Sequence, residues 1–213
     1  MNLLATVRRD AGGLALFAAL TVGVVALTEW ITRDEIEAQR RLARERALLE
    51  ILPADRFDNA ILDDRVELAD PRLGLDEPEP AYLARRGGEA FAALLPVVVP
   101  DGYAGPIRLV VGVRGDGTVL GVRVLEHRET PGLGDAIEVR KSDWIRAFRG
   151  RALGDPPAEA WTVARQGGAF DAMTGATITS EAVIRGVRRS LEWYRDDGRA
   201  RLFAPAETPG EDP

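Results

Sequence analysis

A run of uncharged, mostly apolar residues near the N-terminus constrains this chain more than any other feature of its sequence. Residues 11–28 read AGGLALFAALTVGVVALT, and Trp30 and Ile31 extend the run past the single acid Glu29. Because about twenty apolar residues match the thickness of the hydrocarbon layer, this run predicts a transmembrane helix over residues 11–31. A buried helix of a soluble domain would carry a polar stripe, whereas this segment is apolar all round.

The residues on either side of the predicted span indicate whether it is cleaved and how it is oriented in the membrane. Arg8 and Arg9 precede it like the basic region of a signal peptide, but the apolar run is too long for one and no clean cleavage site follows. We therefore expect an uncleaved anchor. The arginines after the span outnumber those before it, which opposes a cytoplasmic N-terminus, yet long domains translocate largely regardless of charge. We expect residues 1–10 in the cytoplasm and the soluble part outside it.

Composition excludes several classes of function. The chain has no cysteine, one histidine and two methionines, which rules out disulfides, iron–sulfur clusters and thiolate zinc sites and leaves too few ligands for a haem or histidine metal site. We expect no metal site. The net charge of -6 and the pI near 5.0 argue against binding to nucleic acid. If this chain carries electrons, an organic cofactor must hold them.

The pattern after the anchor predicts one α+β domain of ordinary size. Residues 33–52 are rich in helix formers and end before Pro53, which predicts a stalk helix. Prolines, glycines and charges dominate residues 68–88 and predict a loop. The expected division is a cytoplasmic N-terminus (1–10), the transmembrane helix (11–31), a stalk helix with an irregular connection (32–89), the domain itself (90–198) and a flexible tail (199–213).

Individual elements of the domain are also predictable. A β-branched run at residues 107–113, turn residues at 114–117 and a second run at 118–125 predict a β-hairpin. We expect a short helix containing Trp144 and Phe148 and a strand at 161–165. A long helix capped by Ser180 is expected to run to Tyr194 and to be closed by residues 196–198.

Two short clusters could carry chemistry. The first, Asp171–Thr177 (DAMTGAT), places hydroxyls and a glycine just before the expected helix, where backbone N–H groups and the helix dipole favour an anion such as phosphate. Ordinary N-capping by small polar residues is the competing explanation.

The second cluster is HRETPGLGD at residues 127–135, whose proline and two glycines would let a flat ligand approach the main chain. A tight strand-to-helix connection would explain the same residues. The letters ETPG recur at residues 207–210 without the following Leu-Gly-Asp, and we assign that copy no role.

The two clusters together carry a resemblance to a known family. Asp171–Thr177 matches the pattern D-x-x-[ST]-G-A-[ST], which resembles the motif recognised by the flavin transferase that links FMN through a phosphoester. With HRETPGLGD, the SDWI that follows at 142–145, and the Leu52–Asn59 stretch upstream, the chain resembles the G subunit of the Rnf (Rsx) electron-transport complex.

The resemblance implies a set of cofactor-binding residues. Thr177 would be the attachment point, its Oγ esterified to the FMN phosphate, within a motif completed by Asp171, Thr174, Gly175 and Ala176. The isoalloxazine ring would lie against the second cluster, which contributes Glu129, Thr130, Pro131, Gly132 and Leu133. The role of His127 stays open between a flavin contact and a structural one. No histidine lies near Thr177 in sequence to activate its hydroxyl, so an external transferase using FAD and a divalent metal is expected to attach the flavin.

The resemblance also implies a function. The chain would be an electron-carrying subunit of a complex in the bacterial inner membrane that couples electron transfer between ferredoxin and NAD to ion translocation. Its domain would face the periplasm, it would bind other subunits of the complex, and it would have no complete active site of its own. The alternatives are the C subunit of a sodium-translocating NADH:quinone reductase and a flavin-free anchored assembly or sensor protein.

Overall fold

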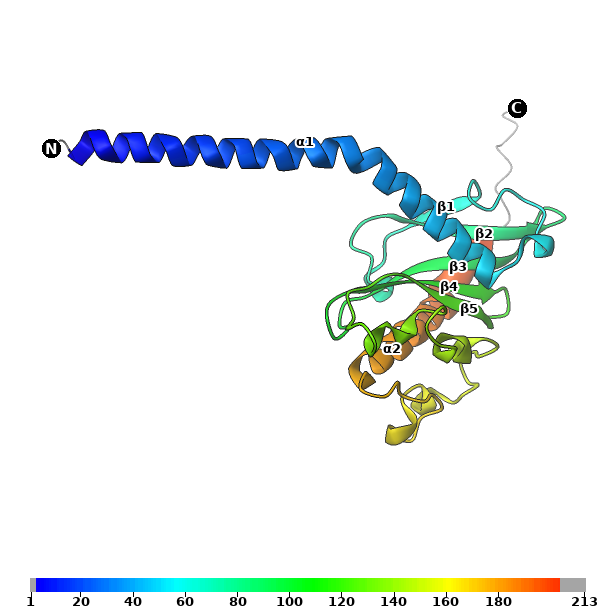
Figure 1. Cartoon of the computed structure of the whole chain (residues 1–213). Coiled ribbons are helices and arrows are strands. Elements are labelled where there is room, and N and C mark those ends of the chain that lie inside the picture. Colours follow the sequence, from blue (N-terminus) through cyan, green and yellow to red (C-terminus); the bar gives the residue numbers. More distant parts are fainter. Residues whose placement is uncertain (1–2, 204–213) are drawn as a thin grey trace, which may run out of the picture. The chain divides into compact units, whose positions relative to one another are not determined.

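The computed structural model describes residues 3–203 and divides the chain into two compact units, one ending at Ala43 and one beginning at Arg44 (Figure 1). The first unit is the N-terminal part of helix α1 (Leu3–Ile51). Its segment Gly13–Ile36 is long and apolar enough to cross a membrane, and its large side chains, such as Phe17 and Leu20, are exposed. This segment overlaps most of the predicted span.

The prediction that the stalk helix stops before Pro53 is confirmed, since α1 ends at Ile51. Proline disfavours helical backbone in the residue before it and cannot donate the next helical hydrogen bond. The chain then turns through a short 3₁₀ helix at Ala54–Arg56.

An antiparallel meander forms the centre of the second unit. Its five strands, hydrogen-bonded in chain order, are β1 (Arg65–Leu68), β2 (Glu79–Arg86), β3 (Glu89–Val99), β4 (Ile107–Arg114) and β5 (Val119–Glu126). The predicted hairpin is confirmed as β4 and β5. Its turn is closed by the Asp116 carboxylate, which accepts hydrogen bonds from the Thr118 N–H at 3.0 Å and from the Arg114 guanidinium.

The loop expected over residues 68–88 is wrong, because β2 occupies its second half. Pro71 and the glycines that suggested a loop lie in the connections on either side of β2, whereas Pro80 lies within this strand. Pro71 begins a 3₁₀ helix that ends at Gly74, and Gly87 and Gly88 connect β2 to β3. Within β2 only residues 81–84 are buried, an apolar run too short to stand out. The sheet thus begins well before residue 90.

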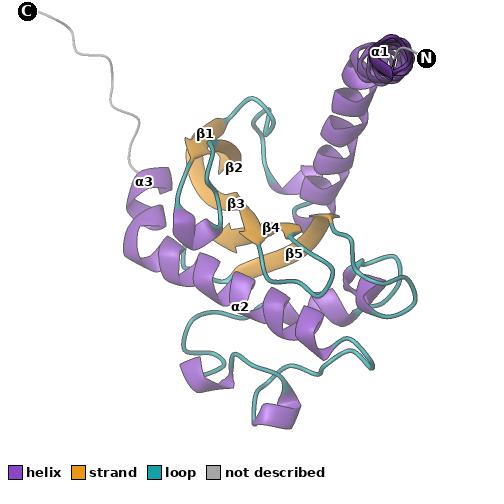
Figure 2. Cartoon of the chain, turned by 90° about the vertical axis from the view of Figure 1, so that its left-hand side faces the viewer, coloured by secondary structure: helices purple, strands orange, loops and turns teal. Residues whose placement is uncertain are grey.

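Helices cover both faces of the sheet, so the α+β class is confirmed (Figure 2). Helix α2 (Thr177–Trp193) packs on one face, where a Cβ on Gly186 would lie 2.3 Å from Val99. The last turns of α1 pack on the other, where a Cβ on Gly112 would lie 2.4 Å from Ile51. At both points a glycine allows the helix to approach the strands closely.

Of the remaining expectations, one is confirmed and the others need correction. Residues 161–165 form no strand but a single bridge between Val163 and Phe170, followed by a 3₁₀ turn at Ala164–Gln166. The short helix around Trp144 is confirmed, as a 3₁₀ helix at Trp144–Phe148. Residues 196–198 do not close the long helix. It continues through a π-helical turn (Tyr194–Gly198) into α3 (Arg199–Phe203), so the start of the expected tail is helical, and residues 204–213 lie outside the described chain.

Candidate functional site

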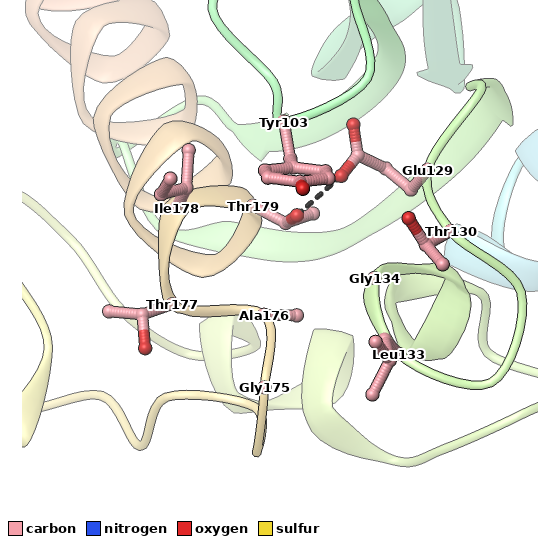
Figure 3. A pocket seen from close by; sticks show the side chains of 10 residues that line it. All are labelled: Tyr103, Glu129, Thr130, Leu133, Gly134, Gly175, Ala176, Thr177, Ile178 and Thr179. Carbon is pink, nitrogen blue, oxygen red and sulfur yellow. Dashed lines mark hydrogen bonds between the residues drawn. The ribbon is translucent and has the colours of Figure 1, made fainter.

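The two clusters singled out in the sequence meet in one pocket of about 420 Å³ (Figure 3). One wall comes from the segment after β5, and the other from the loop before α2 and its first turn. A third element, the loop between β3 and β4, contributes the top of the pocket in this view. The lining residues are Tyr103, Glu129, Thr130, Leu133, Gly134, Gly175, Ala176, Thr177, Ile178 and Thr179.

Helix α2 begins within the motif segment (residues 171–177) and not at Ser180. Thr177 is its first residue, and the N-cap position is held by Ala176, which has no side chain that can cap. Among the described residues, the helix start therefore has no side-chain cap, and its first N–H groups are of the kind that bind anions. The Thr177 side chain is half-buried and lines the pocket. N-capping does not explain Thr177.

The neighbouring hydroxyls are engaged within the fold. The Ser180 Oγ accepts a hydrogen bond from the Met173 N–H at 3.0 Å and donates to the Ala176 carbonyl at 3.0 Å, which ties the motif segment to the first turn of α2. Ser180 thus stabilises the helix entry from inside the helix, which is why the prediction of an N-cap at this residue is wrong. Thr179 is fully buried and donates to the Glu129 carboxylate.

Glu129 joins three segments through its carboxylate. Its Oε1 accepts a hydrogen bond from the Ala104 N–H at 3.0 Å, and its Oε2 accepts one from the Thr179 hydroxyl. The residue is only 3% exposed, and a Cβ on Gly134 would lie 2.9 Å from its Oε2. We call these four residues, Ala104, Glu129, Gly134 and Thr179, the buckle. It fixes the relative positions of the β3–β4 loop, the segment after β5 and the start of α2.

His127 has a structural position behind the buckle. Its Nδ1 accepts a hydrogen bond from the Glu129 N–H at 3.0 Å, which requires that Nε2 carry the proton donated to Glu138 Oε1 at 3.2 Å. Burial opposes ionisation of Glu138, but hydrogen bonds from Lys141, Arg140 and His127 outweigh it and lower the pKa of its carboxyl group from 4.5 to about 2. His127 does not line the pocket.

Not every predicted site residue reaches the pocket. Glu129, Thr130, Leu133, Gly175, Ala176 and Thr177 line it, whereas Pro131, Gly132, Asp171 and Thr174 do not. All four of these are exposed. Gly132 has a φ of +79°, and a Cβ there would meet nothing within 4 Å, so its role in this structure is to turn the chain.

Sequence reasoning missed four lining residues. Gly134 was recognised within the second cluster but not selected, while Ile178 and Thr179 follow the motif directly and would have been found by extending it one helical turn. Tyr103 gave no local signal, because it lies on a loop that only the tertiary fold brings to the pocket.

Comparison with known families agrees with this architecture. The model of an FMN-binding domain matches residues 102–192, a range that contains the whole pocket. The model of the RnfG N-terminal region matches residues 1–51, and this range ends at Ile51, the last residue of α1.

Relatives match over nearly the full chain. A protein of Pseudomonas aeruginosa, named as the G subunit of an ion-translocating oxidoreductase complex, is 49% identical over 205 residues, covering 96% of this chain and 95% of the relative. Proteins with the same name from Vibrio vulnificus and Shewanella loihica are each 42% identical, covering 98% and 93% of this chain and 99% and 94% of their own lengths. The interpretation as an Rnf-type subunit is confirmed over its alternatives: the chain belongs to the family of G subunits of ion-translocating oxidoreductase complexes and carries that family's FMN-binding domain.

Proposed function

We propose that this protein carries electrons within a membrane-bound Rnf-type complex and that it does so with FMN esterified to Thr177. Such a complex couples electron transfer between ferredoxin and NAD to ion translocation. The observation that carries the proposal is the position of Thr177. It is the first residue of α2, lines the pocket and does not cap the helix.

The residues present fit FMN. The volume of about 420 Å³ lies within the range of pockets that hold cofactors. At one end, Thr177 and the first N–H groups of α2 suit a phosphate. Gly175 avoids crowding at this position, because a Cβ there would lie 3.0 Å from Leu133 Cδ2. Its φ of +76° also disfavours any other residue. The exposed apolar side chains of Leu133 and Ile178, which also line the pocket, suit an aromatic ring.

Attachment requires help from outside the chain. In the proposed step Thr177 Oγ forms a bond to the FMN phosphorus of FAD, the pyrophosphate P–O bond breaks, AMP leaves, and the hydroxyl proton passes to a base. A threonine hydroxyl is a weak nucleophile and needs such a base or a metal. Among the lining residues only Glu129 has a carboxylate, and both its oxygens already accept hydrogen bonds. A flavin transferase would supply the base and metal, and the exposed Asp171 and Thr174 are accessible to it.

Once attached, FMN supplies reversible electron uptake, and the protein holds and shields it. The buckle orders the pocket walls, and the ester prevents loss of a cofactor that would otherwise diffuse away. Electrons would pass to and from neighbouring subunits of the complex. No proton transfer by this chain's side chains is needed for that role.

We also propose that the chain is anchored in the bacterial inner membrane by α1, with residues 1–10 in the cytoplasm and the FMN-binding domain in the periplasm. A reporter enzyme that is active only in the periplasm, fused after Pro213, should be active. Activity of a cytoplasm-specific reporter at the same position would contradict this orientation.

The proposed linkage is tested by mass. The full chain is expressed with a flavin transferase, denatured and weighed intact, and its peptides are mapped. We expect the added mass of one FMN less one water, on the peptide that contains Thr177. An unmodified chain, from cells in which the transferase modifies a control substrate, would refute the covalent linkage.

A further inference from the structure

Tyr103 is an exposed aromatic residue on a loop that is otherwise held in place. The loop, residues 100–106, connects β3 to β4, and the Tyr103 side chain is 66% exposed although it lines the pocket. The other two tyrosines, Tyr82 and Tyr194, are buried. An exposed aromatic side chain on the wall of a pocket is a common feature of ligand-binding sites.

Two contacts attach this loop to neighbouring elements. On one side of Tyr103, the Ala104 N–H donates to Glu129 Oε1 at 3.0 Å, which connects the loop to the buckle. On the other side, Asp101 forms an ion pair with Arg185 of α2. Space inside the loop is also limited, because a Cβ on Gly102 would lie 2.4 Å from the Gly105 carbonyl oxygen. The Tyr103 backbone is therefore fixed while its ring stays open to solvent.

In Figure 3 the ring of Tyr103 lies on the opposite side of the pocket from Gly175, and Glu129 and Thr179 line the same pocket. Exposed apolar side chains of Leu133 (45% exposed) and Ile178 (53% exposed) also line the pocket. The pocket thus has the Thr177 hydroxyl and the first N–H groups of α2 on one wall, the aromatic side chain of Tyr103 on another, and aliphatic side chains of Leu133 and Ile178 in its lining. This arrangement complements a ligand that has a phosphate at one end and a flat ring system at the other.

We propose that Tyr103 forms the wall of the pocket against which the isoalloxazine ring packs, and that Glu129 positions it through Ala104. The inference rests on the proposed function, because it assumes that FMN is attached at Thr177. It extends that function by assigning the ring contact to a loop outside both sequence clusters. The hydrogen-bonded carboxylate of Glu129 then determines where the tyrosine meets the ring.

Flavin fluorescence tests this contact directly. A phenol touching an excited isoalloxazine ring quenches its emission by donating an electron that returns to the phenol afterwards. We would prepare the full flavinylated chain as wild type, Tyr103→Leu and Tyr103→Phe, and normalise the emission of each to its FMN content measured by mass. Both variants should fluoresce several-fold more strongly than the wild type, since neither side chain is a comparable electron donor. Tyr194→Phe, a change at a buried tyrosine outside this pocket, should leave the emission unchanged.

Each outcome separates this inference from the function on which it rests. Absence of FMN from the wild type would refute the attachment at Thr177. Normal FMN content with unchanged emission in both Tyr103 variants would overturn the ring contact and leave the attachment intact. If the wild type carries FMN but neither Tyr103 variant does, Tyr103 serves recognition by the transferase and the proposal is again overturned.

Discussion

The motif segment and the buckle both contribute residues to one pocket but differ in exposure. In the motif segment the side chains of Asp171 and Thr174 are exposed and that of Thr177 is half-buried. In the buckle, Glu129 and Thr179 are almost completely buried, and the Thr179 hydroxyl donates a hydrogen bond to the Glu129 carboxylate. The difference is consistent with a segment that a modifying enzyme must reach and a set of contacts that must hold the walls still.

These two parts meet within one turn of α2, because Thr177 and Thr179 are two residues apart. Although the positions are so close, their different burial predicts that substitutions affect either flavin attachment or stability, but not both. Changes in the motif segment should alter flavin attachment with little effect on folding. Changes in the buckle should alter stability and leave attachment possible.

Thr177→Ala should give the largest effect, a complete loss of covalent flavin. Stability should change by less than about 0.5 kcal/mol, because the side chain is half-buried and caps nothing. In-gel flavin fluorescence after denaturation measures the first, and urea unfolding of the full chain in detergent measures the second. Ser180→Ala is the matched control for attachment: it removes a hydroxyl on the same helical turn that is hydrogen-bonded within the fold, so it should lower stability but keep the covalent flavin. Covalent flavin on the Thr177→Ala chain would show that attachment is elsewhere.

Gly134→Ala tests the rigidity of the buckle. The added methyl group would lie 2.9 Å from the Glu129 Cβ and 3.0 Å from Thr179 Oγ1, so the carboxylate must move. We expect a loss of about 3 kcal/mol in the free energy of unfolding, as for overpacked cores. Gly132→Ala is the control on the same loop. There a Cβ has open space and only the positive φ is unfavourable, which costs about 1 kcal/mol. Equal losses in the two variants would mean that the buckle is not tightly packed.

Thr179→Val removes the hydroxyl that donates to Glu129 while keeping the shape of the side chain. A buried carboxylate oxygen without its donor should cost about 2 kcal/mol in stability. Covalent flavin should remain, which distinguishes this variant from Thr177→Ala. Thr162→Val, at a half-buried threonine outside the pocket whose hydroxyl donates to the exposed Gln166, should change stability by less than about 0.5 kcal/mol. Loss of flavin from Thr179→Val would remove the proposed division between the two parts.

The elements predicted correctly are those specified by neighbouring residues. The hairpin at 107–125 follows from its β-branched runs and turn, and the end of α1 follows from Pro53. Errors arose where tertiary contacts decide. Strand β2 exists because β1 and β3 pair with both its edges, and the pairing of Tyr82 with Leu94 is invisible in a local pattern.

The same reasoning explains the site. Both clusters could be found locally, but their meeting in one pocket, and the arrival of Tyr103 there, depend on the sheet. Within the second cluster, sequence alone could not decide which glycine matters. Gly134 lies against Glu129 and Thr179, whereas a Cβ on Gly132 would face open space. Nothing in the sequence of this cluster distinguishes the two glycines.

The dependence of stability on acid pH tests the hydrogen bonds of Glu138, which His127 connects to Glu129 of the buckle. The pKa of Glu138 is about 2 in the fold against an ordinary 4.5, because hydrogen bonds from Lys141, Arg140 and His127 outweigh the effect of burial. Since the folded pKa is the lower one, the stability this carboxylate contributes is fully present above pH 4.5 and is lost as the pH falls toward 2. The free energy of unfolding of Glu138→Gln should therefore be lower than that of the wild type at pH 7 and should fall less steeply between pH 4.5 and 2.

Urea unfolding at a series of pH values measures both effects. Asp70→Asn provides the matched control on another part of the fold. Hydrogen bonding to Arg72 lowers the pKa of Asp70 from 3.8 to about 2, and its carboxylate also accepts a hydrogen bond from Trp193 Nε1 at 2.7 Å. In Asp70→Asn, too, the free energy of unfolding should fall less steeply as the pH is lowered. Only Glu138→Gln should disturb the loop that carries Glu129, because His127 is hydrogen-bonded to both glutamates. A change in flavin emission with Asp70→Asn and none with Glu138→Gln would contradict this coupling of His127 and Glu138 to the buckle.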